Sequence, residues 1–210
     1  GSLYYSYSQI SGEAPAIVYY DGSGRELRTV IKGFDGEDIY LDIEYNSPGQ
    51  VQRKSKPYFH TDNPLWSKYT YDDYGRLVKD SAFDGTVITY SYNGLETTTT
   101  VTKGSQSQTS RVLTNAMGET IESRDNMGNV VYTSYYPDGN VKETYTSVHS
   151  SEKITFTYDD HGNRATIDDP NAGLIETLYD GFGNLVLQVD AKGDSTTFTY
   201  DISGRLTESA

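Results

Sequence analysis

Paired acidic residues are the first feature of this sequence that could carry chemistry. They stand at Asp72-Asp73, Asp159-Asp160 and Asp168-Asp169. A glycosidase needs two carboxyl groups that face each other across a sugar, one of them with a raised pKa. Each pair here belongs to a recurring turn, in which an Asp side chain accepts hydrogen bonds from the backbone a few residues further on. We therefore interpret the pairs as structural and keep a glycosidase-like enzyme as an alternative.

Other residue types that support catalysis or metal binding are scattered or missing. The three histidines, His60, His149 and His161, lie far apart and form no H-E-x-x-H pattern. Oxygen-rich turns could hold calcium, but no segment reads D-x-D-x-D-G or matches the nonapeptide calcium repeat. The sequence has no cysteine, which excludes disulfides, thiol catalysis and cysteine metal sites. It predicts no catalytic residue, no metal and no cofactor.

Charge and composition limit the partners and the fold class. The 17 Lys and Arg residues are outnumbered by 30 Asp and Glu residues, which gives a formal net charge of −13. Such a surface repels the phosphates of nucleic acids and of anionic lipids, so we expect no nucleic-acid partner. No apolar run approaches the roughly 20 residues of a membrane span, so we expect no membrane insertion. The 20 Tyr and 20 Gly residues favour strands and turns, and no helical periodicity is visible.

One motif, Tyr-Asp-x-x-Gly-(Asn/Arg), recurs along the chain and organises it. Its last three copies are spaced 21 residues apart, and a fixed period of this size indicates an array of small supersecondary units. The clearest copies comprise Tyr71, Asp72, Gly75, Tyr158, Asp159, Gly162, Tyr179, Asp180, Gly183, Tyr200, Asp201 and Gly204. Weaker anchors stand at Tyr20, Tyr45, Tyr92, Thr114 and Tyr136, with shortened turns expected at Tyr92 and Tyr136. The motif glycine is expected in the left-handed backbone conformation.

A second turn lies about halfway through each repeat, so one repeat is one β-hairpin. Alternation such as Ile88, Tyr90 and Tyr92 places every second side chain on the same face of the sheet. The sequence thus predicts an all-β fold: antiparallel β-hairpins of about 21–22 residues in one long, twisted, open, half-shell-like sheet. We expect a worn first repeat or N-terminal strand in 1–19, the hairpin array in 20–206, and the truncated end of a longer protein in 207–210.

The segment 51–69 departs from the repeat and holds the candidate ligand-binding residues. It contains Trp66, which is the one tryptophan, together with Tyr58 and Phe59, and two prolines that should exclude it from the middle of a sheet. Insertions in repeat arrays often form the binding face. The alternative is that Trp66 and Phe59 cover an open edge of the sheet.

The Tyr-Asp motif and its spacing resemble the YD repeat of the Rhs (rearrangement hotspot) family, which includes shells of bacterial toxin complexes and the teneurins. The resemblance covers about residues 20–206 and is strongest from residue 71 onward. It implies a bacterial, secreted or cell-surface protein and a β-sheet shell that can enclose a toxin domain. The chain would then be a non-catalytic structural and interaction module whose partner is the rest of its own longer chain or an enclosed cargo domain. Because family members have been associated with carbohydrate, the alternative is an adhesin-type, glycan-binding module.

Overall fold

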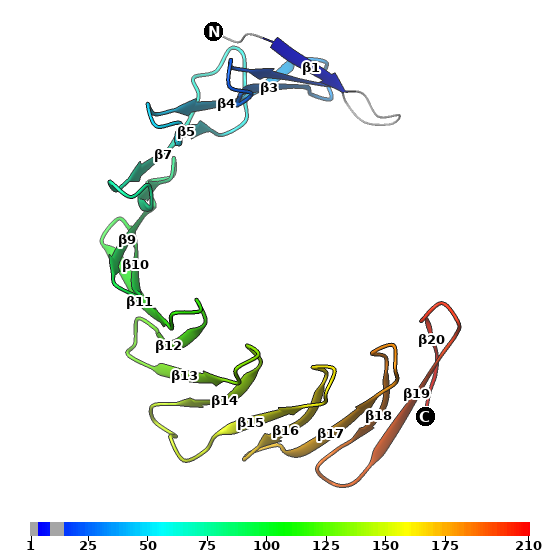
Figure 1. Ribbon diagram of the computed structural model, residues 1–210. Coiled ribbons are helices and arrows are strands. Elements are labelled where there is room, and N and C mark those ends of the chain that lie inside the picture. Colours follow the sequence, from blue (N-terminus) through cyan, green and yellow to red (C-terminus); the bar gives the residue numbers. More distant parts are fainter. Residues whose placement is uncertain (1–3, 9–14) are drawn as a thin grey trace. The chain divides into compact units, whose positions relative to one another are not determined.

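The computed structural model describes residues 4–8 and 15–210, and all regular secondary structure within these residues is β-strand (Figure 1). The 20 strands belong to one open sheet, in which paired strands run antiparallel. The predicted all-β fold of antiparallel hairpins is confirmed, while the half-shell curvature stays a prediction. Two compact units divide the chain, Gly1–Tyr92 with Thr98–Thr109 and Asn93–Thr97 with Ser110–Ala210. Each unit is described by itself.

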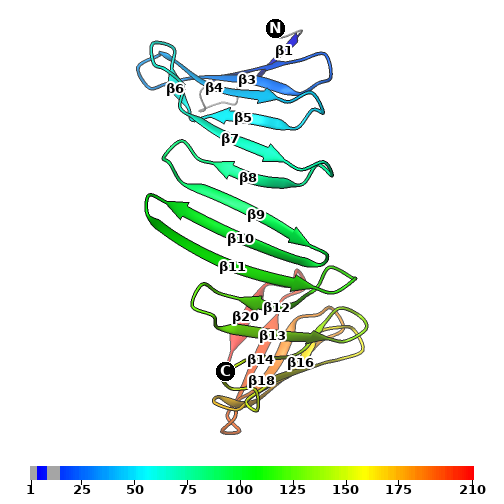
Figure 2. The ribbon, with the colours of Figure 1, turned by 90° about the vertical axis from the view of Figure 1, so that its left-hand side faces the viewer.

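The first unit contains the strands that carry the irregular segment. Its strands are β1 (Tyr4–Ser8), β2 (Ala16–Tyr20), β3 (Glu26–Lys32), β4 (Asp38–Tyr45), β5 (Val51–Ser55), β6 (Tyr58–Phe59), β7 (Trp66–Tyr71), β8 (Leu77–Ser81) and β9 (Val87–Asn93). Figure 2 shows β3, β4, β5, β7, β8 and β9 as successive neighbours. Strands β10 (Glu96–Lys103) and β11 (Gln106–Thr114) contribute residues to both units.

The second unit is the more regular part of the array. Its strands are β12 (Thr120–Arg124), β13 (Val130–Tyr135), β14 (Val141–Thr146), β15 (Ile154–Tyr158), β16 (Arg164–Asp169), β17 (Gly173–Tyr179), β18 (Leu185–Val189), β19 (Ser195–Tyr200) and β20 (Leu206–Ser209). Each pairs with the next along the chain.

A five-residue turn closes each regular hairpin, and the turn at Asp72 shows how. The Asp72 N–H donates to the Arg76 carbonyl (2.9 Å) and the Gly75 N–H donates to the Asp72 carbonyl (3.0 Å). Gly75, in the fourth position, has a φ of 80°, which a residue with a Cβ adopts only with strain. The left-handed conformation predicted for the motif glycines is confirmed. We number the positions of each turn from the residue equivalent to Asp72, so that Asp72 is first, Gly75 fourth and Arg76 fifth.

The sheet has almost no covered core. Val30 and Val130, at 8% and 3% exposure, are the only apolar side chains that are buried among residues 4–8 and 15–210. Most strand side chains are half-buried by their neighbours within the sheet. In the first unit, register and alternation place Tyr45, Tyr71 and Tyr92 on one face, which we call the anchor face. The other is called the opposite face.

Two sequence-based expectations are wrong in detail. The anchor of the repeat at β13 is Tyr135, which ends the strand, whereas Tyr136 occupies the first position of a full-length turn that closes with a 2.8 Å bond from its N–H to the Asn140 carbonyl. The segment 51–69 is not excluded from the middle of the sheet, because β5 pairs with both β4 and β7. Its prolines, Pro57 and Pro64, lie outside the strands and so remove no ladder hydrogen bond.

Candidate functional site

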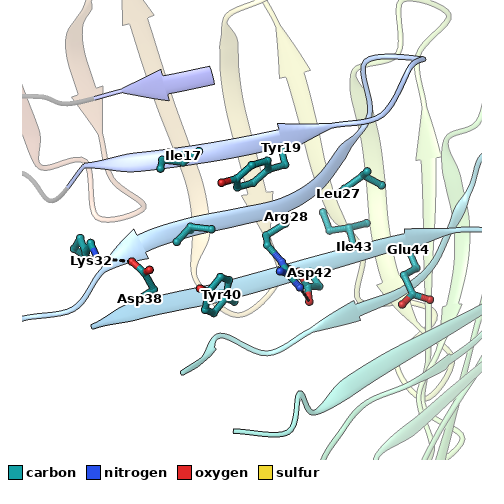
Figure 3. A pocket seen from close by; sticks show the side chains of 11 residues that line it. Ile17, Tyr19, Leu27, Arg28, Lys32, Asp38, Tyr40, Asp42, Ile43 and Glu44 are labelled. Atoms are coloured by element: carbon teal, nitrogen blue, oxygen red, sulfur yellow. Dashed lines mark hydrogen bonds and ion pairs between the residues drawn. The ribbon is translucent and has the colours of Figure 1, made fainter. Parts of the chain in front are cut away.

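The irregular segment creates a fork in the sheet beside β4. The C-terminal half of β4 pairs with β5, whereas Ile39 and Tyr40 in its N-terminal half pair with Phe59 and Tyr58 of β6. Residues at alternate positions of β4, Asp38, Tyr40, Asp42 and Glu44, therefore share the opposite face. With Tyr19, Arg28 and Lys32 they line a hollow of about 630 Å³ (Figure 3).

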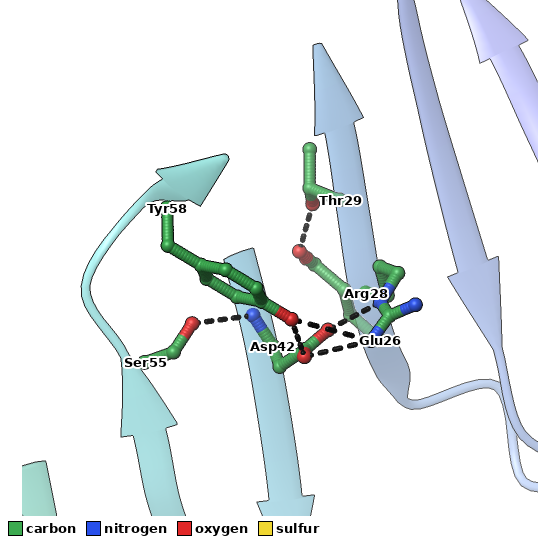
Figure 4. Close-up of polar contacts among 6 residues, drawn as sticks. All are labelled: Glu26, Arg28, Thr29, Asp42, Ser55 and Tyr58. Atoms are coloured by element: carbon green, nitrogen blue, oxygen red, sulfur yellow. Dashed lines mark hydrogen bonds and ion pairs between the residues drawn. The ribbon is translucent and has the colours of Figure 1, made fainter. Parts of the chain in front are cut away.

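Asp42 is the centre of a polar cluster in this hollow (Figure 4). Arg28, its cross-strand partner, donates from Nε to Oδ1 (2.5 Å) and from Nη2 to Oδ2 (2.8 Å). The Tyr58 hydroxyl donates to Oδ2 (2.6 Å), and the Asp42 N–H donates to Ser55 Oγ (2.8 Å). Strands β3 and β6 are thus joined to β4 through the Asp42 carboxylate, and β5 is joined to it through the Asp42 backbone.

The cluster keeps Asp42 ionised. Burial disfavours its charged form, but hydrogen bonds from Arg28 and Tyr58 outweigh that effect and hold the pKa of the carboxyl below its usual value. Burial, followed by the hydrogen bond to Asp42, raises the pKa of the Tyr58 hydroxyl. The arrangement therefore presents a neutral phenol and an internally compensated ion pair, and neither is prepared for proton transfer near neutral pH.

The three predicted ligand residues do not form one site. Tyr58 joins the Asp42 cluster, and Trp66 lies beneath the Arg53 guanidinium, whose carbon is 4.1 Å from the indole centroid. Arg53 also donates two bonds of 2.6 Å to Glu44. Phe59 pairs with Ile39 and so lies on the anchor face. A ligand role for Trp66, Tyr58 and Phe59 stays a prediction.

The sequence-based reasoning missed Arg28, Tyr40 and Asp42. The Arg28 guanidinium carbon lies 4.9 Å from the Tyr40 centroid, so Arg28 of β3 contacts both Tyr40 and Asp42 of β4. Their signal was the alternation Asp38, Tyr40, Asp42 and Glu44, together with the turn at Gly33–Glu37, from which the register can be counted. The same combination of carboxylate, arginine and aromatic ring recurs as Asp21–Arg25–Tyr45, Glu44–Arg53–Trp66 and Asp72–Arg76–Tyr92.

The carboxylates of the motif aspartates accept hydrogen bonds from residues of their own turns. Asp72 Oδ1 accepts from the N–H groups of Tyr74 (3.0 Å) and Arg76 (2.9 Å), and Oδ2 accepts from Arg76 Nε (2.8 Å). The same bond to the fifth N–H forms in the turns that begin at Asp21, Asn46, Asn115, Asp125, Asp159, Asp180, Asp190 and Asp201. The hydrogen bond from the Asn163 side chain is the main cause that lowers the pKa of Asp159. For Asp72, desolvation raises the pKa, but hydrogen bonds from Arg76 outweigh it and lower the pKa overall. A general acid would need the reverse shift.

Five of the repeats are also bonded to their predecessors by their anchor tyrosines. The Tyr71 hydroxyl donates to the Val51 carbonyl (2.9 Å), and the Tyr92 hydroxyl donates to the Leu77 carbonyl (2.8 Å). Tyr45, Tyr135 and Tyr200 make the equivalent bond to Glu26, Thr120 and Leu185. In every case the acceptor lies six residues after the preceding anchor. The tyrosine of the motif therefore connects consecutive repeats through their backbone.

The histidines and the acids do not gather into a metal centre. Among residues 4–8 and 15–210, no group of three or more His, Asp or Glu side chains is placed to hold a metal ion. His149 Nδ1 lies 3.5 Å from Glu152 Oε2 within one loop. The backbone N–H of His161 donates to Asp159 Oδ1 within the turn. In the same described part of the chain, no helix has the length and apolar character that a membrane crossing requires.

Comparison with known proteins agrees with this geometry. Residues 179–210, which comprise the hairpin from Tyr179 through β20, match the family model described as RHS Repeat. Residues 179–210 therefore belong to the RHS-repeat family. The resemblance to the Rhs family is thereby confirmed.

Two curated relatives are similar in sequence to about two thirds of this chain. The tRNA3(Ser)-specific nuclease WapA of Bacillus spizizenii is 30% identical over 154 residues, and the tRNA nuclease WapA of Bacillus subtilis is 29% identical over 153 residues. These alignments cover 65% and 64% of this chain but 6% of each relative. The chain thus spans a small part of the length of the relatives that it matches.

Solved structures show the same fold. The crystal structures of TcdB2-TccC3-TEV and TcdB2-TccC3-Cdc42 superpose with a TM-score of 0.74 at 19% and 20% identity. The match covers 98% of this chain and 13% of each of those chains. The open hairpin array is therefore an architecture that recurs inside much longer proteins.

Proposed function

We propose that this chain is a non-catalytic structural and interaction module that forms part of the β-sheet shell of a longer bacterial protein. The observation that carries the proposal is the repeat-to-repeat bonding by the anchor tyrosines, exemplified by Tyr71 to Val51 and Tyr92 to Leu77. Such bonding lets a sheet grow by one hairpin at a time without a covered core, which is what a shell made of a single sheet requires. The partner is the rest of the same protein or a domain that the shell encloses, and the location is extracellular or at the cell surface.

The motif acids support the absence of catalysis in this module. Their carboxylates are bonded to turn amides, and the pKa values of Asp72 and Asp159 are lowered rather than raised. The nuclease names of the Bacillus relatives belong to proteins of which this chain covers 6%. Nuclease chemistry therefore lies outside the module in our proposal.

An activity screen tests the proposal. The full chain is incubated with tRNA, glycan and peptide substrates, beside the variants Asp72→Asn and Asp159→Asn. We expect no turnover by any of the three proteins and altered stability in the variants. A turnover that either substitution abolishes would reverse the assignment and restore the glycosidase-like or another enzymatic alternative.

A second candidate function is glycan binding on the opposite face of the first unit. The hydroxyls of Tyr19 and Tyr40 line the 630 Å³ hollow without a hydrogen-bond partner among the described residues, beside ion pairs that are already compensated. Neutral hydroxyls next to aromatic rings suit the hydroxyl groups and C–H faces of a sugar.

A glycan array followed by titration tests this second function. Trp66→Ala and Tyr40→Ala alter the opposite face, and Phe59→Ala is the matched control because Phe59 lies on the anchor face. We expect the first two substitutions to weaken binding at least fivefold and the control to leave it unchanged. Absence of binding, or equal effects of all three substitutions, leaves the module as a shell segment alone.

A further inference from the structure

Among the five-residue turns that directly follow an anchor residue, the turn that begins at Tyr136 is the one in the described residues without Asp or Asn in first position. The mid-repeat turns that begin at Gly33 and Ala82 show the same departure, with Asp35 and Asp84 in third position.

In the turn at Tyr136, the capping role passes to Asp138, whose two carboxylate oxygens accept from the N–H and the Nδ2 of Asn140, both at 3.0 Å. The Tyr136 ring is thus released from the turn. It extends to the next repeat, where its hydroxyl donates to the Phe156 carbonyl (3.1 Å).

The displaced ring forms an aromatic corner with the anchor tyrosine of that repeat. The rings of Tyr136 and Tyr158 meet at 88°, with their centroids 6.1 Å apart. Together with Pro137, Asp138, Thr157 and Asp159 they line a hollow of about 350 Å³, which we call the Tyr136 corner. Both rings are half-buried, whereas Asp138 and Thr157 are exposed at its mouth.

The residues that line the Tyr136 corner include two carboxylates, Asp138 and Asp159, and no Lys or Arg to match them. The Asp159 carboxylate is bonded to the neutral Asn163, whereas Asp72 in the first unit is paired with Arg76. Lys142 Nζ lies 5.9 Å from the Tyr136 centroid, near the outer limit of about 6 Å for a cation–π contact.

The surroundings add to this imbalance. The second unit holds 17 of the 30 acidic residues but seven of the 17 basic ones, so it carries −10 of the formal charge of −13. A field of one sign around a hollow raises the local concentration of ions of the other sign. Aromatic faces and carboxylates attract the same kind of guest, because the electron-rich face of a ring attracts cations.

We propose that the Tyr136 corner binds the head group of an organic cation, an ammonium or a guanidinium. The two rings provide the cation–π surface, and Asp138 and Asp159 provide the counter-charge. Lysine and arginine side chains of a partner polypeptide and a free choline share this chemistry. The inference is independent of the shell function, since it concerns one repeat in which the first turn position is altered.

Titration of the full chain with small probes tests the inference. The probes are choline, N-acetyl-lysinamide and N-acetyl-argininamide, with 3,3-dimethylbutanol as the uncharged isostere of choline. Binding is followed by the NMR signals of the tyrosine rings. We expect at least one cation to shift the Tyr136 and Tyr158 signals saturably and to bind at least tenfold more tightly than the isostere. The order of the three cations then identifies the source of the head group.

Two substitutions and a control complete the test. Tyr136→Asp introduces the residue that most of the turns after an anchor carry in first position, and so removes the ring while preserving the turn; we expect affinity to fall at least fivefold. Asp138→Asn keeps the capping acceptor and removes one charge, with a smaller loss expected. Phe182→Ser removes an exposed ring from a different turn and should change nothing. Equal binding of choline and its isostere, no saturable shift with any cation, or unchanged affinity in a folded Tyr136→Asp variant would overturn the proposal.

Discussion

Gln50 donates from Nε2 to the carbonyl oxygen of Gly75, 2.9 Å away, so the fifth residue of one turn is bonded to the fourth residue of the next. The same neighbours meet elsewhere in the array. A Cβ placed on Gly49 would lie 2.8 Å from Arg25 Nη1, and one on Gly139 would lie 3.2 Å from Glu119 Oε1. Shorter Asn side chains stay near 4 Å, as between Asn184 and Gly204. The turns along one edge of the sheet are therefore in contact as well as the strands.

The first and fifth turn positions are complementary in donor and acceptor character. An Asp in first position faces a donor in most turns, as in Asp72–Arg76 and Asp159–Asn163, the exception being Asp190, whose fifth residue is Asp194. An Asn in first position faces an acceptor, as in Asn46–Gln50 and Asn115–Glu119. Asp72→Asn would place two donors opposite each other, whereas in Asp159→Asn the amide of Asn163 can rotate to present its oxygen.

We therefore expect Asp72→Asn to lower the melting temperature by a few degrees and Asp159→Asn by less than half as much. Thermal unfolding followed by circular dichroism measures both. Equal losses would show that charge rather than hydrogen-bond matching sets the preference.

Contact between adjacent turns predicts a graded cost for glycine substitutions. Gly49 and Gly85 have φ values of 92° and 83°, but a Cβ on Gly85 would meet nothing within 4 Å. Gly85→Ala should cost about 1–2 kcal/mol for the left-handed backbone alone. Gly49→Ala should cost more, since the new methyl group displaces Arg25 from its place over the Tyr45 ring, 4.6 Å from the centroid. Urea unfolding of the two variants compares them, and an equal loss would rule out the turn contact.

The anchor hydroxyl should contribute measurably to stability. Tyr71→Phe removes the bond to the Val51 carbonyl, and we expect a loss of about 1 kcal/mol in the free energy of unfolding. Tyr69→Phe is the control, because Tyr69 lies two residues earlier on the same strand without a hydrogen bond from its hydroxyl among the described residues. If both variants lose the same amount in urea unfolding, the ring rather than the hydroxyl holds the repeats together.

Acid should destabilise the array. Hydrogen bonds within the turns hold the pKa values of several motif aspartates below the ordinary value of an aspartate. These are Asp21, Asp125, Asp180 and Asp201, with bonds from Arg25, Asn129, Asn184 and Arg205. A carboxyl with a depressed pKa in the folded state stabilises it fully above the unfolded-state pKa and loses that contribution as pH falls through the folded-state value. We expect the urea midpoint to be steady from pH 7 to about 5 and to fall below about pH 4. A midpoint that does not change down to pH 2 would contradict the role of the aspartates.

Local features of this fold could be predicted from the sequence because they depend on few residues. Asp72 and Gly75 are sufficient to predict a turn, and the recurrence of this motif about every 21 residues predicts the other turns. The error at Tyr136 arose because two consecutive tyrosines compete for the anchor position, and the choice depends on which one ends β13. The Arg28–Asp42 register follows from the turn at Gly33–Glu37, but the bond from Tyr58 to Asp42 could not be predicted, since it depends on the fork that β6 introduces 16 residues further on.

The contact between the fifth residue of one turn and the glycine of the next also bears on how such arrays can evolve. Duplication of a whole hairpin copies the fifth-position side chain together with the glycine of its turn. The contact between successive turns is then kept, so the array can lengthen by copying. Exchange of two distant hairpins would place an arginine that suits Gly49 beside Gly183, where an asparagine oxygen now lies 3.8 Å from the position that a Cβ would take. Recombination within these genes should therefore leave tandem copies more often than shuffled ones.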